Sequence, residues 1–170
     1  VHAYPFDSQT STFIVETDAQ SWARAGFDRR TTEESVAYLE ELFAPELAGH
    51  RLLTNKSIWR NFRTVKCERW SHENFVLIGD AAHTAHFSIG SGTKIAMEDA
   101  ICLVERLTPA GSADEVQQAL AGYYEERWLD VAKLQRAARV SRTWFEEIGR
   151  YKQFAPEQMV MSLLTRSKRV

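Results

Sequence analysis

The sequence predicts an α+β fold in which a mixed sheet precedes a helix-rich C-terminal half. Short runs of β-branched and aromatic residues, such as residues 12–17, lie in the first half. Residues 75–78 form a continuous apolar run, which is typical of a short strand covered on both faces. From residue 114 to residue 153, apolar side chains recur at helical spacing with few interruptions. These three patterns together indicate strands first and long helices afterwards.

Residues 1–72 are expected to form the end of a larger sheet region. Extended runs at 2–6 and 12–17 flank a polar turn and predict a hairpin. Asp18 is expected to cap a short helix, and Thr31 or Thr32, with Glu34 in the first turn, to cap a second helix that ends at Pro45. Residues 57–70 alternate partly in polarity, so we expect a long strand with one face in water.

The remaining chain divides into residues 73–110, a strand, loop and helix, and residues 111–170, a helical region. A turn rich in Pro, Gly and Ser separates the two at residues 108–113. We expect one long helix from residue 114, or two with a bend near Gly122, and then a short amphipathic helix over 157–164. A basic tail follows at residues 166–170.

Composition excludes several classes of function. The net charge of −2 provides no general attraction to nucleic acid or to an anionic membrane. No apolar run is long enough to cross a bilayer. Cys67 and Cys102 lie in unrelated contexts, so we expect two reduced thiols in a cytoplasmic protein.

Residues 75–107 carry the chemistry. Asp80 follows the apolar run where a strand would surface, and ligands gather beyond the carboxyl ends of strands. Gly90 and Gly92 permit positive φ or close backbone approach, and Thr93 begins a helix whose first amides lack partners. The apolar stripe expected to pack this helix comprises Ala96, Ala100, Leu103, Val104 and Leu107. The combination predicts a receptor for a polyhydroxylated, electron-rich ligand.

Three short segments of residues 75–107 resemble a known motif: residues 79–83 (GDAAH), 90–92 (GSG) and 98–100 (EDA). They are similar to the second flavin-binding motif of the FAD-dependent aromatic monooxygenases built on the p-hydroxybenzoate hydroxylase fold. The sequences of residues 86–94 (HFSIGSGTK) and 96–100 (AMEDA) resemble most closely the branch of this family that acts on aryl-CoA thioesters.

The resemblance implies a set of roles for these residues. Gly79, Asp80, Gly90, Gly92, Thr93 and Lys94 would bind FAD, with Asp80 on the ribityl chain and the amides of Thr93 and Lys94 stabilising the anionic reduced flavin. NAD(P)H would supply the electrons and O2 the oxygen atom. The substrate would be an aromatic molecule and, by the resemblance to the aryl-CoA branch, an aryl-CoA thioester. His86 and Phe87 depart from the prolines usual in this loop, and Lys94 from an asparagine. His86 and Phe87 are therefore candidates to face the flavin and the substrate ring.

The resemblance also implies that this is the C-terminal portion of a larger flavoprotein. No G-x-G-x-x-G follows a strand in this sequence, and in the family an N-terminal Rossmann segment holds the ADP half of FAD. We therefore expect the segment alone to bind FAD very weakly and to be inactive.

Alternatives remain at several positions. Asp80, His83 and His86 form a D-x-x-H-x-x-H pattern, but no further ligand is evident, so we expect no metal and a structural hydrogen bond from His83. The same motif serves other FAD-dependent oxidoreductases and halogenases. A non-catalytic interaction module is a third alternative; it would leave free the aromatic face of the long helix, formed by Tyr123, Trp128 and Phe145. Two sets of residues suit either a substrate site or an ordinary surface: Trp59, Arg60 and Arg63, and the basic ridge of Lys133, Arg136, Arg139 and Arg142.

Overall fold

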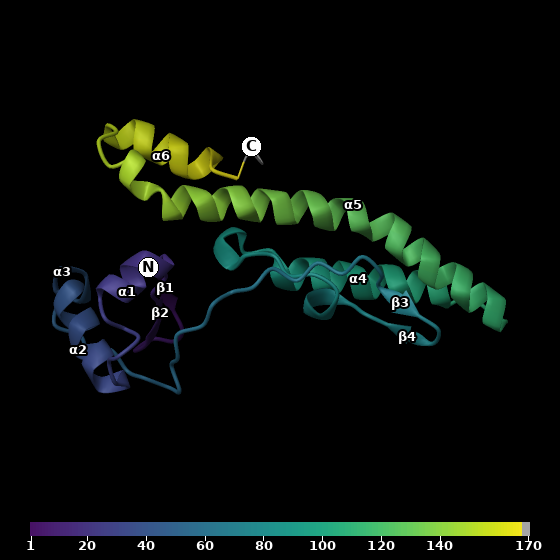
Figure 1. Cartoon of the computed structure of the whole chain (residues 1–170), viewed down its shortest axis with the longest axis horizontal. Coiled ribbons are helices and arrows are strands. Elements are labelled where there is room, and N and C mark those ends of the chain that lie inside the picture. Colours follow the sequence, from purple (N-terminus) through teal and green to yellow (C-terminus); the bar gives the residue numbers. More distant parts are fainter. Residues whose placement is uncertain (168–170) are drawn as a thin grey trace. The chain divides into compact units, whose positions relative to one another are not determined.

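The computed structural model describes residues 1–167, and the chain divides into two compact units, Val1–Asn61 and Phe62–Val170. Figure 1 shows their elements along the chain. The described strands form two separate two-stranded antiparallel hairpins. The expected mixed sheet is therefore absent from the described residues.

The first unit begins with the predicted hairpin. Strands β1 (His2–Pro5) and β2 (Ser11–Ile14) pair in antiparallel register. The Asp7 carboxylate accepts hydrogen bonds at 2.7 Å from the amides of Gln9 and Thr10, which closes the turn between the strands.

Three helices follow, and the first two have the caps that the sequence predicts, whereas the third was not predicted. Asp18 caps α1 (Ala19–Arg24), and Thr31 forms a capping box with Glu34 at the start of α2 (Thr32–Leu42). Pro45 lies in the first turn of the short α3 (Ala44–Leu47), where its missing N–H is tolerated.

The predicted long strand over residues 57–70 is wrong. This segment is irregular and makes a single β-bridge, between Lys66 and His83. The Val65 amide donates to the hydroxyl of Thr84 at 2.7 Å rather than to a backbone carbonyl. A ladder needs backbone partners on a neighbouring strand, so the pairing stops here. Trp59 packs on Phe27, with ring centroids 4.5 Å apart.

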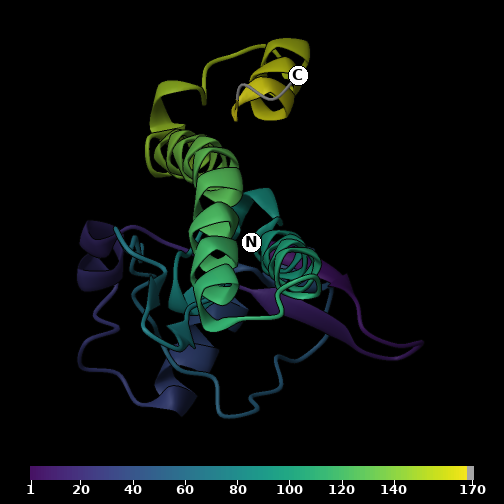
Figure 2. The same cartoon turned by 90° about the vertical axis from the view of Figure 1, so that its right-hand side faces the viewer.

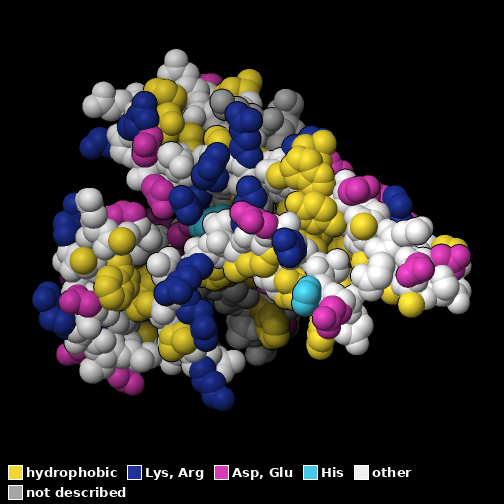
Figure 3. Space-filling model, turned by 45° about the vertical axis from the view of Figure 1, so that its right-hand side comes forward, with side chains coloured by type: hydrophobic (Ala, Val, Ile, Leu, Met, Phe, Trp, Pro, Cys, Tyr) yellow, Lys and Arg dark blue, Asp and Glu magenta, His cyan; other side chains and the backbone are white. Residues whose placement is uncertain are grey.

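The apolar run at residues 75–78 is likewise not a strand covered on both faces. Strand β4 (Phe75–Val76) pairs only with β3 (Ser71–His72), and Phe75 is 72% exposed. Within the described part of the chain β4 has a neighbour on one edge alone, and its outer side chains meet no second layer. Figure 3 shows such hydrophobic side chains (yellow) at the surface.

Helices dominate the second unit. Helix α4 (Gly92–Leu107) lies beside the unbroken 34-residue α5 (Ala113–Glu146), and α6 (Pro156–Thr165) folds back along the C-terminal end of α5 (Figures 1 and 2). One long helix was among the two expected arrangements. A Cβ at Gly122 would lie 2.6 Å from Arg106 Nη1, which is the far end of a flexible side chain on α4.

The face of α4 that packs overlaps the predicted stripe, because Leu103 packs against the core and Ala96, Ala100 and Leu107 are half-buried. Only Val104 of the predicted stripe is exposed, at 62%. The fully buried residues of α4 are Ile95, Asp99 and Cys102, which the predicted stripe did not include. One of them is a carboxylate, which a count of apolar residues cannot detect.

The core of this unit gathers around Trp70, Ala82, Cys102, Tyr123 and Val131. Both cysteines are free thiols, as expected. Among the described helices, none is long and apolar enough to cross a membrane. The basic tail predicted at 166–170 lies partly outside the described residues.

Candidate functional site

The candidate site begins at the short 3₁₀ turn η1 (Gly79–Ala81), which follows β4. Gly79 is buried with φ +54°, and a Cβ there would meet Ala96 Cβ at 2.9 Å, so only glycine fits without strain. Its amide donates to Asp99 Oδ2 at 3.1 Å. Asp80 comes next; its side chain is exposed and makes no hydrogen bond or ion pair among residues 1–167. The turn therefore presents a carboxylate that makes no polar contact with the part of the chain that the structure describes.

The N-terminus of α4 is the second part of the site. Ser91 provides no side-chain cap, and the amides of Gly92, Thr93 and Lys94 have no hydrogen-bond partner within the described structure. Gly90 has φ +60°, and no atom lies within 4 Å of a Cβ built at Gly90 or Gly92. The Lys94 ammonium pairs with Glu98 one turn later. The end of α4 thus offers unpaired N–H groups and the positive end of the helix dipole beside open space.

His86 and Phe87 are held in a small aromatic group at the 3₁₀ turn η2 (Phe87–Ile89). Their rings stack with centroids 4.6 Å apart, and Phe62 packs against Phe87 at 4.9 Å. His86 Nδ1 accepts a hydrogen bond from the Ser88 amide at 3.3 Å. Their role toward flavin and substrate stays a prediction.

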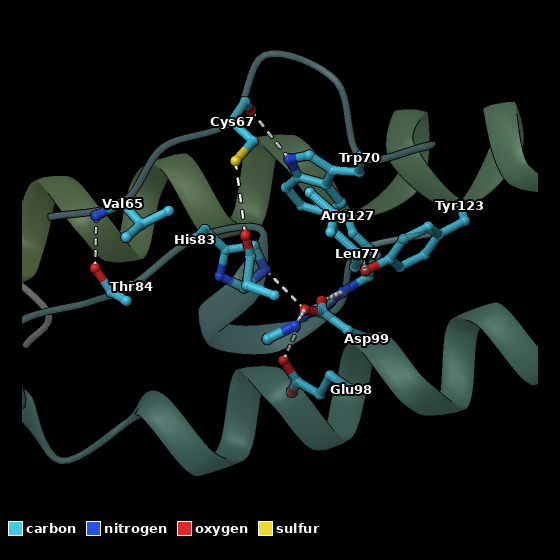
Figure 4. Close-up of polar contacts among 12 residues, drawn as sticks. Val65, Cys67, Trp70, Leu77, His83, Thr84, Glu98, Asp99, Tyr123 and Arg127 are labelled. Carbon is cyan, nitrogen blue, oxygen red and sulfur yellow. Dashed lines mark hydrogen bonds and ion pairs between the residues drawn. The ribbon is translucent and has the colours of Figure 1, made fainter. Parts of the chain in front are cut away.

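Beneath these loops lies a buried ionic network that motif reasoning missed (Figure 4). Asp99 is fully buried; its Oδ2 lies 2.7 Å from His83 Nε2, and its Oδ1 accepts from Arg127 Nε at 3.0 Å. Arg127 also donates through Nη2 to Glu98 at 2.9 Å. With the Gly79 amide, three donors converge on one carboxylate and join η1, α4 and α5.

The network is charged despite its burial. Desolvation alone would raise the pKa of Asp99, but hydrogen bonds from His83, Arg127 and the Gly79 amide outweigh it, and the pKa lies below the usual aspartate range. Burial acts to lower the pKa of Arg127, yet its bonds to Asp99 and Glu98 leave that pKa raised. Facing an ionised carboxylate, His83 Nε2 carries the proton. Its Nδ1 is buried without a partner within the described residues.

Aromatic rings keep water from this network. Trp70 packs on His83 with centroids 4.8 Å apart and on Tyr123 at 5.4 Å. Tyr123 is fully buried and donates its hydroxyl to the Leu77 carbonyl at 3.3 Å, and burial raises the pKa of its phenol. Tyr123 therefore packs on the segment that follows β4 instead of standing free for a partner, although Trp128 is 44% exposed.

The suspected metal pattern does not assemble. The Asp80 side chain is exposed to solvent, whereas the His83 side chain is 1% exposed and lies against Asp99 in the interior, so the two cannot share one metal ion. No group of three or more His, Cys, Asp or Glu side chains within residues 1–167 is placed to hold a metal ion. The structural hydrogen bond expected from His83 is confirmed, and its partner is Asp99 on α4.

Two signals in the sequence could have identified the network. Asp99 shares helical spacing with Ile95 and Cys102, and Arg127 lies four residues from both Tyr123 and Val131. A charged residue at helical spacing among core positions indicates a buried pair.

Comparisons with known proteins support the flavin interpretation of the loops. A family model described as "FAD binding domain" matches residues 1–138. Among curated relatives, the salicyloyl-CoA 5-hydroxylase of a Streptomyces species is 49% identical over 176 residues, which cover 98% of this chain and 34% of the relative. The 3-hydroxy-4-methyl-anthranilyl-(aryl-carrier protein) 5-monooxygenase of Streptosporangium sibiricum is 42% identical, covering 86% of this chain and 37% of the relative. The protodeoxyviolaceinate monooxygenase of Chromobacterium violaceum is 38% identical, covering 98% and 44% respectively. The chain thus spans less than half the length of these relatives.

Proposed function

Because the chain belongs to the FAD-binding domain family, we propose that it is part of an FAD-dependent monooxygenase that hydroxylates an aromatic substrate. Two observations carry this proposal: the Asp80 carboxylate, which follows the glycine that packs on Ala96 of α4 and makes no hydrogen bond or ion pair among residues 1–167, and the uncapped N-terminus of α4. Three relatives named as hydroxylases or monooxygenases support the reaction class.

The donor set suits FAD. The Asp80 carboxylate can accept hydrogen bonds from the hydroxyls of the ribityl chain. Gly90 and Gly92 leave room for a flat ring, because neither position places a side chain over the loop. The amides of Thr93 and Lys94 can donate to the pyrimidine edge, where the reduced ring carries negative charge. When bound, FAD supplies hydride acceptance and oxygen activation, and the protein supplies binding, orientation and electrostatics.

The Asp99 network supports the site without touching the ligand. Asp99 holds the Gly79 amide and His83 from the same oxygen, so the η1 turn that carries Asp80 is fixed against α4. Arg127 binds the other oxygen of Asp99 and fixes α4 against α5. The loop geometry at the cofactor therefore depends on a buried ion pair.

The rest of the cofactor site belongs, in this proposal, to another segment of the same polypeptide. An N-terminal Rossmann segment would hold the ADP half of FAD and cover the exposed Phe75, together with the outward stripe of α4 formed by Met97, Ile101 and Val104. NAD(P)H would be the reductant. The two free cysteines favour a reducing compartment, and we propose a cytoplasmic location.

The first experiment removes the charge of Asp80. In the protein that carries this chain, Asp80→Asn should weaken FAD binding about 10-fold, because a charge-assisted hydrogen bond is worth ~1.5–3 kcal/mol. Asp130→Asn is the matched control, since Asp130 is an exposed carboxylate on α5 that pairs with Lys133. Flavin fluorescence titration measures the affinity, and equal affinity in Asp80→Asn and wild type would refute the assignment.

The second experiment identifies the reaction. NAD(P)H oxidation is followed under O2 with a panel of aromatic acids and their CoA thioesters, and the products are examined for an added oxygen atom. The names of two relatives, one acting on a CoA thioester and one on an aryl-carrier-protein substrate, favour a thioester. A halogenated product, or oxidation without oxygen transfer, would support the alternative oxidoreductase or halogenase activity.

A further inference from the structure

A cavity of about 390 Å³ lies between α5 and α6. Its lining includes Arg139, Thr143, Trp144, Tyr151, Thr165 and Arg166. These residues follow residue 138, where the match to the FAD-binding family model ends. The cavity therefore lies beyond the segment that the family model matches.

The cavity has ordered walls. Trp144 is buried and donates through Nε1 to Ser162 on α6 at 2.8 Å, and its ring stacks on Tyr151 with centroids 5.2 Å apart and an interplanar angle of 12°. Arg166 donates to the buried Ser141 hydroxyl at 3.0 Å. These contacts fix α6 on α5 and place an aromatic pair in the wall.

Among residues 1–167, the charged side chains that line the cavity are two arginines, Arg139 and Arg166. Arg166 uses its donors internally, on Ser141, on the Leu163 carbonyl and on the Ser88 carbonyl. Arg139 is exposed and has no hydrogen bond or ion pair among the described residues. Thr143 lies one helical turn beyond it, on the same face of α5. A free guanidinium with a hydroxyl on the same face suits a phosphate group.

One contact links this cavity to the candidate flavin site. Arg166, which lines the cavity, donates through Nη2 to the Ser88 carbonyl at 3.0 Å. Ser88 lies in η2, directly after Phe87 and before Gly90, in the loop proposed to face the flavin and the substrate ring. The Ser88 hydroxyl is itself buried without a partner in the described structure. A ligand that extends from this loop into the cavity would have its reacting end at η2 and its anionic end at Arg139.

We propose that this cavity binds the phosphate of a phosphopantetheine arm, so that the substrate is an aromatic acyl thioester anchored by that arm. The inference rests on the proposed function, whose reaction it narrows to one substrate class. Coenzyme A and acyl carrier proteins both carry the acyl group on a phosphopantetheine arm. The CoA-linked and carrier-linked substrates in the relatives' names therefore share this arm.

The test compares three probes in the FAD-loaded protein: salicyloyl-CoA, S-salicyloyl-4′-phosphopantetheine and S-salicyloyl-pantetheine, which lacks the phosphate. Arg139→Gln should weaken binding of the two phosphorylated probes about 10-fold, the effect of losing a charge-assisted contact to a phosphate, and leave the third unchanged. Arg136→Gln is the matched control, because Arg136 is an exposed arginine one turn earlier on α5, lies outside the cavity lining and makes no hydrogen bond or ion pair within residues 1–167. Calorimetric titration gives each Kd without turnover.

The outcomes separate the sources of the arm and the two proposals. Equal affinity for the first two probes assigns recognition to the arm alone, as a carrier protein would present it, and tighter binding of salicyloyl-CoA adds a contact to its nucleotide; both support the proposal. Equal loss in Arg136→Gln and Arg139→Gln, or equal affinity of wild type for all three probes, overturns it. Hydroxylation of free salicylate with no selectivity among the probes would leave the proposed function standing without the cavity. If binding of the phosphorylated probes depends on Arg139 but no aromatic compound is hydroxylated, the cavity proposal stands and the proposed function fails.

Discussion

Replacement of Asp99 by asparagine tests whether the buried network holds the candidate site together. The substitution keeps the shape of the side chain and removes its charge. It leaves Arg127, which is 8% exposed, without its buried counter-ion at 3.0 Å, and it removes the charged acceptor of His83 and of the Gly79 amide.

The expected magnitude follows from the contacts that remain. Loss of one partner of a buried ion pair costs about 3–5 kcal/mol of the free energy of unfolding, because the other charge stays desolvated. Arg127 retains Glu98 at 2.9 Å through its Nη2, so we expect a loss at the low end of that range, about 3 kcal/mol. A loss of this size is a large share of the stability of an ordinary domain.

Urea unfolding followed by tryptophan fluorescence measures the effect, since Trp70 packs directly on His83. Asp130→Asn is the matched control: the chemical change is the same, but the carboxylate is exposed on α5 and pairs with Lys133. The reasoning is refuted if the two variants lose the same free energy, because the charge at Asp99 would then be as dispensable as one on the surface.

Further predictions concern glycine strain, acid stability and a buried phenol. Gly79→Ala should destabilise the protein by about 1–3 kcal/mol more than Gly90→Ala, because both have positive φ but only Gly79 lacks space for a Cβ; similar midpoints in urea would contradict this. The pKa of Asp99 is lowered in the folded state. Its ionised carboxylate therefore stabilises the fold fully above the unfolded-state pKa of about 4, and this stabilisation is lost as pH falls through the folded-state pKa. The free energy of unfolding should therefore fall less steeply with decreasing pH in Asp99→Asn than in wild type, and equal slopes would exclude a contribution from Asp99. Tyr123→Phe should cost about 1 kcal/mol by leaving the Leu77 carbonyl without its donor. In ultraviolet titration of the wild type, one of the five tyrosines should remain protonated well above the ordinary phenol pKa, and this signal should be absent from Tyr123→Phe.

The features that the sequence predicts well depend on contacts between near neighbours. Asp18 accepts hydrogen bonds from amides two and three residues away, and Thr31 and Glu34 complete a capping box within one turn. The uncapped start of α4 is also local, since it requires only a glycine-containing loop before a helix. The partners in these interactions lie within a few residues of each other, so residue type and spacing in the sequence are enough to predict them.

The features that the sequence did not predict depend on pairing over long separations. Partial alternation over residues 57–70 is compatible with a strand, but a strand forms only where a neighbouring backbone is present, and here the hydroxyl of Thr84 takes the place of that partner. Exposure of Phe75 likewise depends on what lies next to β4.

The sequence by itself determined the motif, the family resemblance and the loop residues suited to a flavin. Only the tertiary structure decided that Asp99 joins His83, 16 residues away, and Arg127, 28 residues away, and that Arg166 reaches Ser88 across 78 residues. The physical reason is that an ion pair in a dry interior becomes identifiable only when α4, α5 and the η1 turn have packed and excluded water.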